Sequence, residues 1–326
     1  MQTALKSFLL LLLVAVPAFA QNGTWARQPA GTMAWLHAVY FIDQNRGWAV
    51  GSKGTVLQTL DGGNTWKPRG ASTNDVVHDI FFTDENNGWL VCAVNIYELK
   101  TKEQPRAYLM KTTDGGEHWK RVEIEGIDVD SILVRAVFSS SGRGWTFGEA
   151  GTIYTTNDSG DTWTKLQSPT RRLLLGGMFV DNDRGWIVGA GATIIQTSDG
   201  GETWYQSTLP QVEKTTRFTA ATFVDNRKGW AVGSAGSVYQ TVNGGRTWQR
   251  QDSTVTVDLF DVKFVDALEG WAVGAEGTII HTSDGGEHWT TERSGTGHPL
   301  ERVFFASRNR GWAVGFGGTV VAYLRG

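Results

Sequence analysis

The stretch GWAVGSKGTVLQTLDGGNTW at residues 47–66 decides the fold, because versions of it recur along the whole chain. Gly-Trp pairs begin at residues 47, 88, 144, 185, 229, 270 and 311, in steps of 41, 56, 41, 44, 41 and 41 residues. Most of them are followed by a second element, an acidic turn that ends in Trp: TLDGGNTW, TTDGGEHW, TNDSGDTW, TSDGGETW, TVNGGRTW and TSDGGEHW. A repeat of about 41 residues is typical of a β-propeller blade or a solenoid unit.

Each unit reads as four short strands. In the first unit these are residues 38–42, 48–51, 55–59 and a strand that begins at residue 65, with turns rich in Gly, Asn and Asp between them. Short strands joined by such turns indicate antiparallel hairpins. The high content of Gly (41 residues) and Trp (15 residues) also argues against a helical protein. The predicted fold class is all-β, with four-stranded antiparallel blades.

The two chain ends share one repeat. Six boxes, five of them acidic, accompany seven Gly-Trp units, and the segment Asn22-Gly23-Thr24-Trp25 resembles the end of the missing seventh box. An open solenoid has no reason to divide a repeat between its ends. We therefore predict a seven-bladed propeller whose ring is closed by the N-terminal strand, with residues 22–27 as the outermost strand of the last blade.

The first twenty residues have the pattern of a signal peptide: an apolar run over residues 7–16 and a small-x-small cleavage site at Ala18-Phe19-Ala20. A membrane anchor is the alternative, but Pro17 interrupts a run far shorter than the roughly 20 apolar residues that span a bilayer. We expect a signal peptide at residues 1–20, one propeller domain at 21–326 and no membrane span after cleavage. The expected location is periplasmic or extracellular, and the expected state is a monomer.

Two further features complete the domain prediction. The 56-residue step indicates an insertion at about residues 93–107 in the second blade. Cys92 is the only cysteine, so an intramolecular disulfide is impossible.

The repeated carboxylates have a structural interpretation. Asp tolerates tight turns and accepts backbone N–H bonds there, Gly supplies a positive φ, and the final Trp buries a large apolar surface. The series comprises Asp61, Asp114, Asp158, Asp199 and Asp284, which we expect to lie one per blade and far apart. No ligand set has metal-binding spacing, and the Gly-rich stretches near Gly189 and Gly315 precede no helix. We expect no metal and no cofactor. A net charge of −3 gives no indication of a nucleic-acid partner.

At the level of the whole unit, GWAVGSKGTVLQTLDGGNTW and GWAVGAEGTIIHTSDGGEHW resemble the photosystem II assembly and stability factor propellers of cyanobacteria and chloroplasts. The boxes alone resemble the Asp-box, or BNR repeat, of sialidases. The first resemblance covers nearly all of residues 22–326. It implies a non-catalytic photosynthesis factor that binds early reaction-centre subunits through an arginine patch. This sequence departs from that pattern, because its only compact arginine pair is Arg171-Arg172.

The candidate partner-binding residues are basic groups expected on the face that carries the second turns and the links between blades. Loops that vary on a rigid scaffold are where function is usually found. The predicted patch comprises Arg135, Arg171, Arg172, Arg217 and Arg302. Scattered solubilising charge is the alternative. A second basic series precedes Gly-Trp on the opposite face: Arg46, Arg143, Arg184, Lys228 and Arg310.

The predicted function is that of a non-enzymatic, exported, protein-binding assembly factor whose partner is another protein, such as a membrane-complex subunit. The alternative is a carbohydrate-active or carbohydrate-binding propeller. Glycoside hydrolysis needs a pair of carboxylates about 5–10 Å apart. Glu149 and Glu276 lie in equivalent turns of separate blades without an evident partner, so the sequence predicts no catalytic residues.

Overall fold

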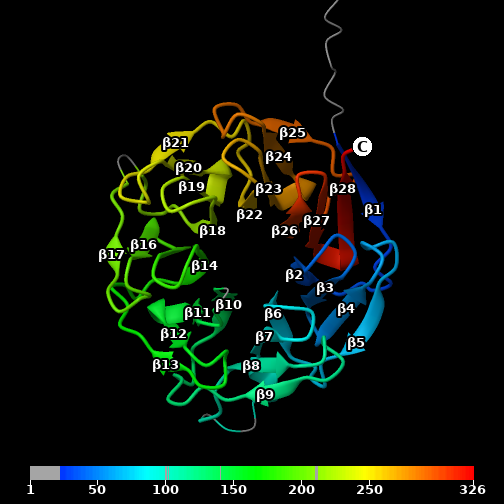
Figure 1. Ribbon diagram of the computed structural model, residues 1–326, viewed down its shortest axis with the longest axis vertical. Coiled ribbons are helices and arrows are strands. Elements are labelled where there is room, and N and C mark those ends of the chain that lie inside the picture. The colour runs from blue at the N-terminus through cyan, green and yellow to red at the C-terminus, as the bar shows by residue number, and fades with distance from the viewer. Residues whose placement is uncertain (1–22, 100, 102, 140, 210–211) are drawn as a thin grey trace, which may run out of the picture.

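The computed structural model describes residues 23–326, apart from 100, 102, 140 and 210–211. The described residues form seven four-stranded antiparallel sheets in a ring (Figure 1). This confirms the predicted all-β seven-bladed propeller. The predicted signal peptide at 1–20 lies outside the described residues. Within the described part of the chain, no helix has the length and apolar character needed to cross a membrane.

The seven innermost strands stand around the ring axis (Figure 1). From blade 1 to blade 7 they are β2 (Leu36–Phe41), β6 (Val76–Phe82), β10 (Leu133–Phe138), β14 (Leu174–Phe179), β18 (Phe218–Phe223), β22 (Leu259–Phe264) and β26 (Leu300–Ser307). The Gly-Trp strands come second: β3 (Gly47–Gly51), β7 (Gly88–Ala93), β11 (Gly144–Gly148), β15 (Gly185–Gly189), β19 (Gly229–Gly233), β23 (Gly270–Gly274) and β27 (Arg310–Gly315).

The two outer layers of strands flank the acidic boxes. The third strands are β4 (Thr55–Thr59), β8 (Ala107–Thr112), β12 (Ile153–Thr156), β16 (Thr193–Thr197), β20 (Val238–Thr241), β24 (Ile279–Thr282) and β28 (Thr319–Leu324). The outermost strands are β5 (Lys67–Gly70), β9 (Lys120–Val122), β13 (Thr164–Lys165), β17 (Tyr205–Gln206), β21 (Gln249–Gln251), β25 (Thr290–Glu292) and β1 (Thr24–Gln28). Short 3₁₀ turns are η1 (Ile96–Glu98), η2 (Glu149–Gly151), η3 (Ser234–Gly236), η4 (Ala275–Gly277) and η5 (Phe316–Gly318).

The predicted closure of the ring is confirmed. Strand β1 pairs antiparallel with β28 over five residues, from Thr24 opposite Leu324 to Gln28 opposite Val320, and completes the sheet of β26 and β27. Both ends of the chain therefore meet in blade 7, where Figure 1 shows β1 beside β28. Closure pairs a sheet edge that an open array would leave exposed.

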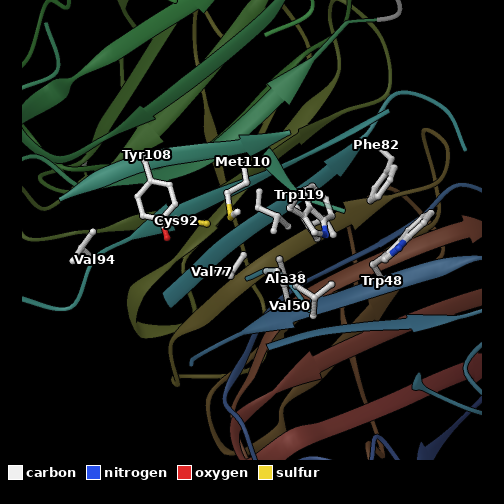
Figure 2. Close-up of a cluster of buried hydrophobic side chains, with 14 residues drawn as sticks. Ala38, Trp48, Val50, Val77, Phe82, Cys92, Val94, Tyr108, Met110 and Trp119 are labelled. Atoms are coloured by element: carbon white, nitrogen blue, oxygen red, sulfur yellow. The ribbon is translucent and has the colours of Figure 1, made fainter. Parts of the chain in front are cut away.

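The Gly-Trp pair forms the contact between neighbouring blades. Trp48 of β3 stacks on Phe82 of the next blade, with ring centroids 3.8 Å apart, and Phe82 in turn meets the box residue Trp119 edge-on (Figure 2). The preceding Gly is needed because a Cβ at Gly47 would lie 2.4 Å from the ring of Phe41 on the adjacent strand. Equivalent stacks lie at every junction: Trp48–Phe82, Trp89–Phe138, Trp145–Phe179, Trp186–Phe223, Trp230–Phe264, Trp271–Phe305 and Trp312–Phe41.

The same junction buries the single cysteine. Cys92 lies in the apolar cluster between blades 1 and 2, with Tyr108 and Met110 nearby (Figure 2). Burial raises the pKa of the Cys92 thiol to about 12. Cys92 is therefore a small core side chain rather than a reactive thiol.

The chain direction sorts the loops into two faces. The first turns and the acidic boxes share one face, called here the box face. The second turns and the links between blades share the other, called here the link face. The inserted segment between β7 and β8 is a second turn and lies on the link face, where Val94 N donates to Arg106 O and prolongs the strand pairing.

Candidate functional site

The acidic boxes use their carboxylates inside their own turns. In the first box, Asp61 accepts hydrogen bonds from the backbone N–H of Thr65 at 2.8 Å and from its hydroxyl at 2.6 Å. The hydroxyl of Thr59 donates to Asp61 and accepts the amide of Gly63. The bonds from Thr65 hold the pKa of Asp61 at about 2. The structural interpretation of the boxes is therefore confirmed.

Variant boxes keep the same turn with other side chains. In blade 5, Asn243 replaces the acid and still accepts the amide of Thr247, while its own amide donates to the Thr247 hydroxyl. In blade 6, His288 replaces Thr and its Nδ1 lies 2.7 Å from the carboxylate of Asp284. The repeat conserves a hydrogen-bonded turn rather than an active carboxylate.

The basic residues before Gly-Trp also have structural contacts. Arg310 donates to the carbonyl of Gly62 in the neighbouring blade, and Trp312 donates to the same oxygen. Lys228 reaches the carbonyl of Ala267 across the next junction. Arg46 and Arg143 likewise bond to the next blade, whereas Arg184 pairs with Asp181 in its own turn, so every member of the series has a structural partner.

Three of the five predicted partner-binding arginines lie together on the link face. Arg171 and Arg172 precede β14, and both are exposed. The guanidinium of Arg172 borders Gly191 in the turn between β15 and β16, and the same turn receives a hydrogen bond from Ala192 N to Thr216 O, next to Arg217. Arg172 therefore borders this turn with its side chain, whereas only the backbone before Arg217 contacts it and the Arg217 guanidinium extends toward Asp258 of blade 6. We call Arg171, Arg172 and Arg217 the link-face arginines.

The link-face arginines differ in their pairing. Arg217 lies 3.3 Å from the carboxylate of Asp258 and remains about half exposed. Among the described residues, the guanidinium groups of Arg171 and Arg172 form no ion pair. Arginine forms bidentate bonds to carboxylates, so these two groups are available to an acidic partner.

The other two predicted arginines, Arg135 and Arg302, point into the ring rather than onto its rim. Their side chains are only 12% and 15% exposed. Arg135 lies 3.4 Å from Asp261, and Arg302 lies 3.3 Å from Asp79 and 3.9 Å from Asp261. The structure thus separates the five residues into two groups, one on the link face and one on the axis.

Sequence reasoning missed the acidic members of the axial group, Asp79 and Asp261. The repeat held a signal for them: aligned on the inner strands, this position is Ala38, Gly176 or Ala220 in three blades and charged in the other four. Burial raises the pKa of both carboxyls to about 6, although Arg135 lowers it. A charged residue at an inner-strand position that is Ala or Gly in other blades is the sequence signal that would have identified these axial carboxylates.

The carboxylates considered for hydrolysis stay on separate blades. Glu149 in η2 accepts the amide of Ile132, and Glu276 lies in η4 of blade 6. Among the described residues, no group of three or more His, Cys, Asp or Glu side chains is arranged to hold a metal ion.

Fold and box chemistry together define a seven-bladed Asp-box propeller. The chain belongs to the family described as photosynthesis system II assembly factor YCF48, whose model matches residues 18–78, 71–171, 161–254 and 251–324. The resemblance noted in the sequence is therefore confirmed at the level of the family. No match was found among curated proteins.

Solved structures show the same architecture. YCF48 from Cyanidioschyzon merolae is similar with a TM-score of 0.73 and 20% identity, covering 92% of this chain and 98% of that one. A structure described as YCF48 bound to D1 peptide has a TM-score of 0.74 and 20% identity, covering 95% and 99%. The Niastella koreensis GH74 enzyme has a TM-score of 0.71 and 15% identity, covering 91% of this chain and 53% of that one. At these identities the likeness shows the fold alone.

Proposed function

We propose that this chain is a non-enzymatic, protein-binding propeller that assists the assembly of a membrane protein complex, and that it works in the periplasm or outside the cell. The observation that carries the proposal is the group of link-face arginines, of which Arg171 and Arg172 are exposed and unpaired among the described residues. Membership of the YCF48 family and the related complex with a D1 peptide support a protein partner.

The chemistry of the site favours an acidic segment of the partner. Arg172 borders the β15–β16 turn, and the backbone just before Arg217 contacts the same turn while the Arg217 guanidinium extends toward Asp258 of blade 6. An extended acidic segment that runs along this rim of the link face meets both charges. Exposed charge pairs are screened by salt, so binding should weaken as ionic strength rises.

Charge reversal tests the proposal. The triple variant Arg171→Glu, Arg172→Glu and Arg217→Glu should lose capture of the protein that the wild type retains from the native periplasmic and membrane fractions. Its melting temperature should change little, because none of the three side chains is buried.

A matched control exists on the box face. Arg184, Arg227 and Arg246 are also three exposed arginines, and they line one cavity of about 530 Å³. Reversing these three to Glu should leave capture intact. If this set abolishes capture and the link-face set does not, the proposed binding face is wrong.

Carbohydrate binding is the second candidate, and one observation favours it. Trp35, the only Trp outside the repeat, is exposed on the link face and meets the exposed ring of Phe316 at 5.4 Å. Aromatic surfaces of this kind stack on sugars. A GH74 xyloglucanase from Xanthomonas campestris has the same fold, so xyloglucan oligosaccharides are the probe. In a calorimetric titration of wild type and Trp35→Ala, heat that depends on Trp35 supports sugar binding, and the absence of heat counts against it.

A further inference from the structure

The inner strands enclose a cavity of about 250 Å³ on the ring axis. Its lining runs from the middle of these strands to their carboxyl ends, so it lies toward the box face, away from the link-face arginines. We call this cavity the axial well. It is smaller than the roughly 300–1,000 Å³ typical of sites for drug-sized molecules, and it suits a single small group.

One side of the axial well is aromatic. Tyr40 lies between Phe81 and Phe304, with ring centroids 5.0 and 5.2 Å away, and Phe81 contacts Phe138 at 5.5 Å. Met178 continues the apolar wall on another blade. These side chains line the well and offer an apolar guest a contact surface.

The end of the axial well that lies nearer the link face is charged. Here Asp79 and Asp261 meet Arg135 and Arg302, and each carboxylate also accepts a backbone amide of the following blade: Ala136 N at 3.1 Å and Val303 N at 3.0 Å. The carboxylates thus have several donors each. The Nε atoms of both arginines, in contrast, are buried without an acceptor among the described residues.

Lys263 is a third cation in the lining of the well, in addition to Arg135 and Arg302. It lies two residues beyond Asp261 on β22, faces the same side of the strand and lines the well. Within the described residues, its ammonium makes no hydrogen bond and no ion pair. Burial lowers its pKa, although Asp261 opposes the effect. A half-buried cation without an acceptor is costly to the fold, and a bound anion removes that cost.

We propose that the axial well binds a monocarboxylate carried on a small apolar body. Lys263 takes the carboxylate, and the wall of Tyr40, Phe81 and Phe304 takes the apolar body. The single excess positive charge of the lining selects a monoanion over a phosphate dianion. Such a group is supplied either by a free aromatic or aliphatic acid or by the C-terminal residue of a peptide. The site is independent of the link-face arginines.

Calorimetry on the full mature chain tests the site with three probes: 3-phenylpropionate, the peptide Gly-Gly-Gly-Phe with a free carboxyl, and the same peptide amidated. At least one of the two acids should bind. Lys263→Met should weaken that binding at least tenfold without lowering the melting temperature, and Lys67→Met, on the exposed outer strand β5, should leave it unchanged.

The outcomes separate the sources of the ligand. Binding of 3-phenylpropionate alone assigns a free acid, binding of the acid peptide alone assigns a chain end, and binding of both shows a well that accepts either. The proposal is overturned if neither acid binds, if the amidated peptide binds as tightly as the free one, or if Lys263→Met and Lys67→Met bind alike. None of these results depends on capture of a protein by the link face.

Discussion

Replacing Trp25 with Ala should test whether ring closure stabilises the whole propeller. Trp25 is the only large side chain that the N-terminal strand buries, with 8% of its surface exposed. It meets Phe305 edge-on at 5.8 Å and Tyr323 at 5.3 Å. Its indole N–H donates to Glu292 of blade 6 at 2.7 Å, so one side chain joins blades 6 and 7.

The expected loss follows from these contacts. Truncating a buried Trp to Ala costs about 3–5 kcal/mol. Glu292, whose side chain is 19% exposed, loses the indole donor but keeps His281 Nδ1 at 3.3 Å, which places this case near ~4 kcal/mol. Unfolding entropy is about 2.1 cal/mol/K per residue, so for a chain of roughly 300 residues such a loss lowers the melting temperature by about 6 °C.

Scanning calorimetry with two matched Trp→Ala variants gives the comparison. Trp163 occupies the same box position in blade 3 and is 6% exposed, so its loss should cost a similar amount. Trp35 is 41% exposed outside the repeat, so its loss should shift the melting temperature by less than about 2 °C. If Trp25→Ala behaves like Trp35→Ala rather than Trp163→Ala, β1 frays independently and closure does not hold the ring together.

Two further predictions concern the buried and boxed carboxylates. Asp158→Asn should cost less than about 1 kcal/mol by denaturant midpoint, because Asn243 already makes the equivalent turn, whereas Asp158→Ala orphans the amide and hydroxyl of Thr162 and should cost about 1–3 kcal/mol. Burial raises the pKa of Asp261 to about 6, above the unfolded value of about 3.9, so its carboxyl favours folding below pH 4 and loses that contribution as the pH rises to 6. The melting temperature of Asp261→Asn relative to wild type should therefore rise between pH 4 and pH 7, and a constant difference would contradict the shifted pKa.

The blades and their closure could be predicted because their signals are local and repeated. A Gly-Trp pair, a three-residue second turn and an acidic box lie within twenty residues of one another, and each fixes a turn or a close approach. The seventh box, divided between the two chain ends, predicted the closure of the ring. The contacts of Trp25 in blade 7 match those of the box Trp in other blades and confirm that prediction. The interblade stacks were missed, because nothing within one repeat shows that its Trp packs on the Phe of the next.

The axial charges could not be found from local patterns. Arg135 meets Asp261 across 126 residues of sequence, and Arg302 meets Asp79 across 223. These pairs form because the inner strands of opposite blades converge on the axis, which a linear reading of the chain does not reveal. The sequence therefore placed Arg135 and Arg302 with the link-face arginines, although the bulge in each inner strand turns them into the ring.

In a repeat protein, the residues that break the pattern are the ones that need a separate explanation. Glu269 replaces the basic residue that precedes Gly-Trp in most blades, and ring closure explains it: it accepts hydrogen bonds from Arg325 at 2.7 Å, beside the split seventh box, and lies 2.9 Å from Arg308. Asp79 and Asp261 are acidic at an inner position that is small in three blades and arginine in two, and their arginine partners explain them. No such structural contact accounts for Lys263 on the axis or for Arg171 and Arg172 on the rim among the described residues. The fold satisfies its other departures from the repeat but leaves these cations without partners, and this is why we propose that each of the two places receives an anion from outside.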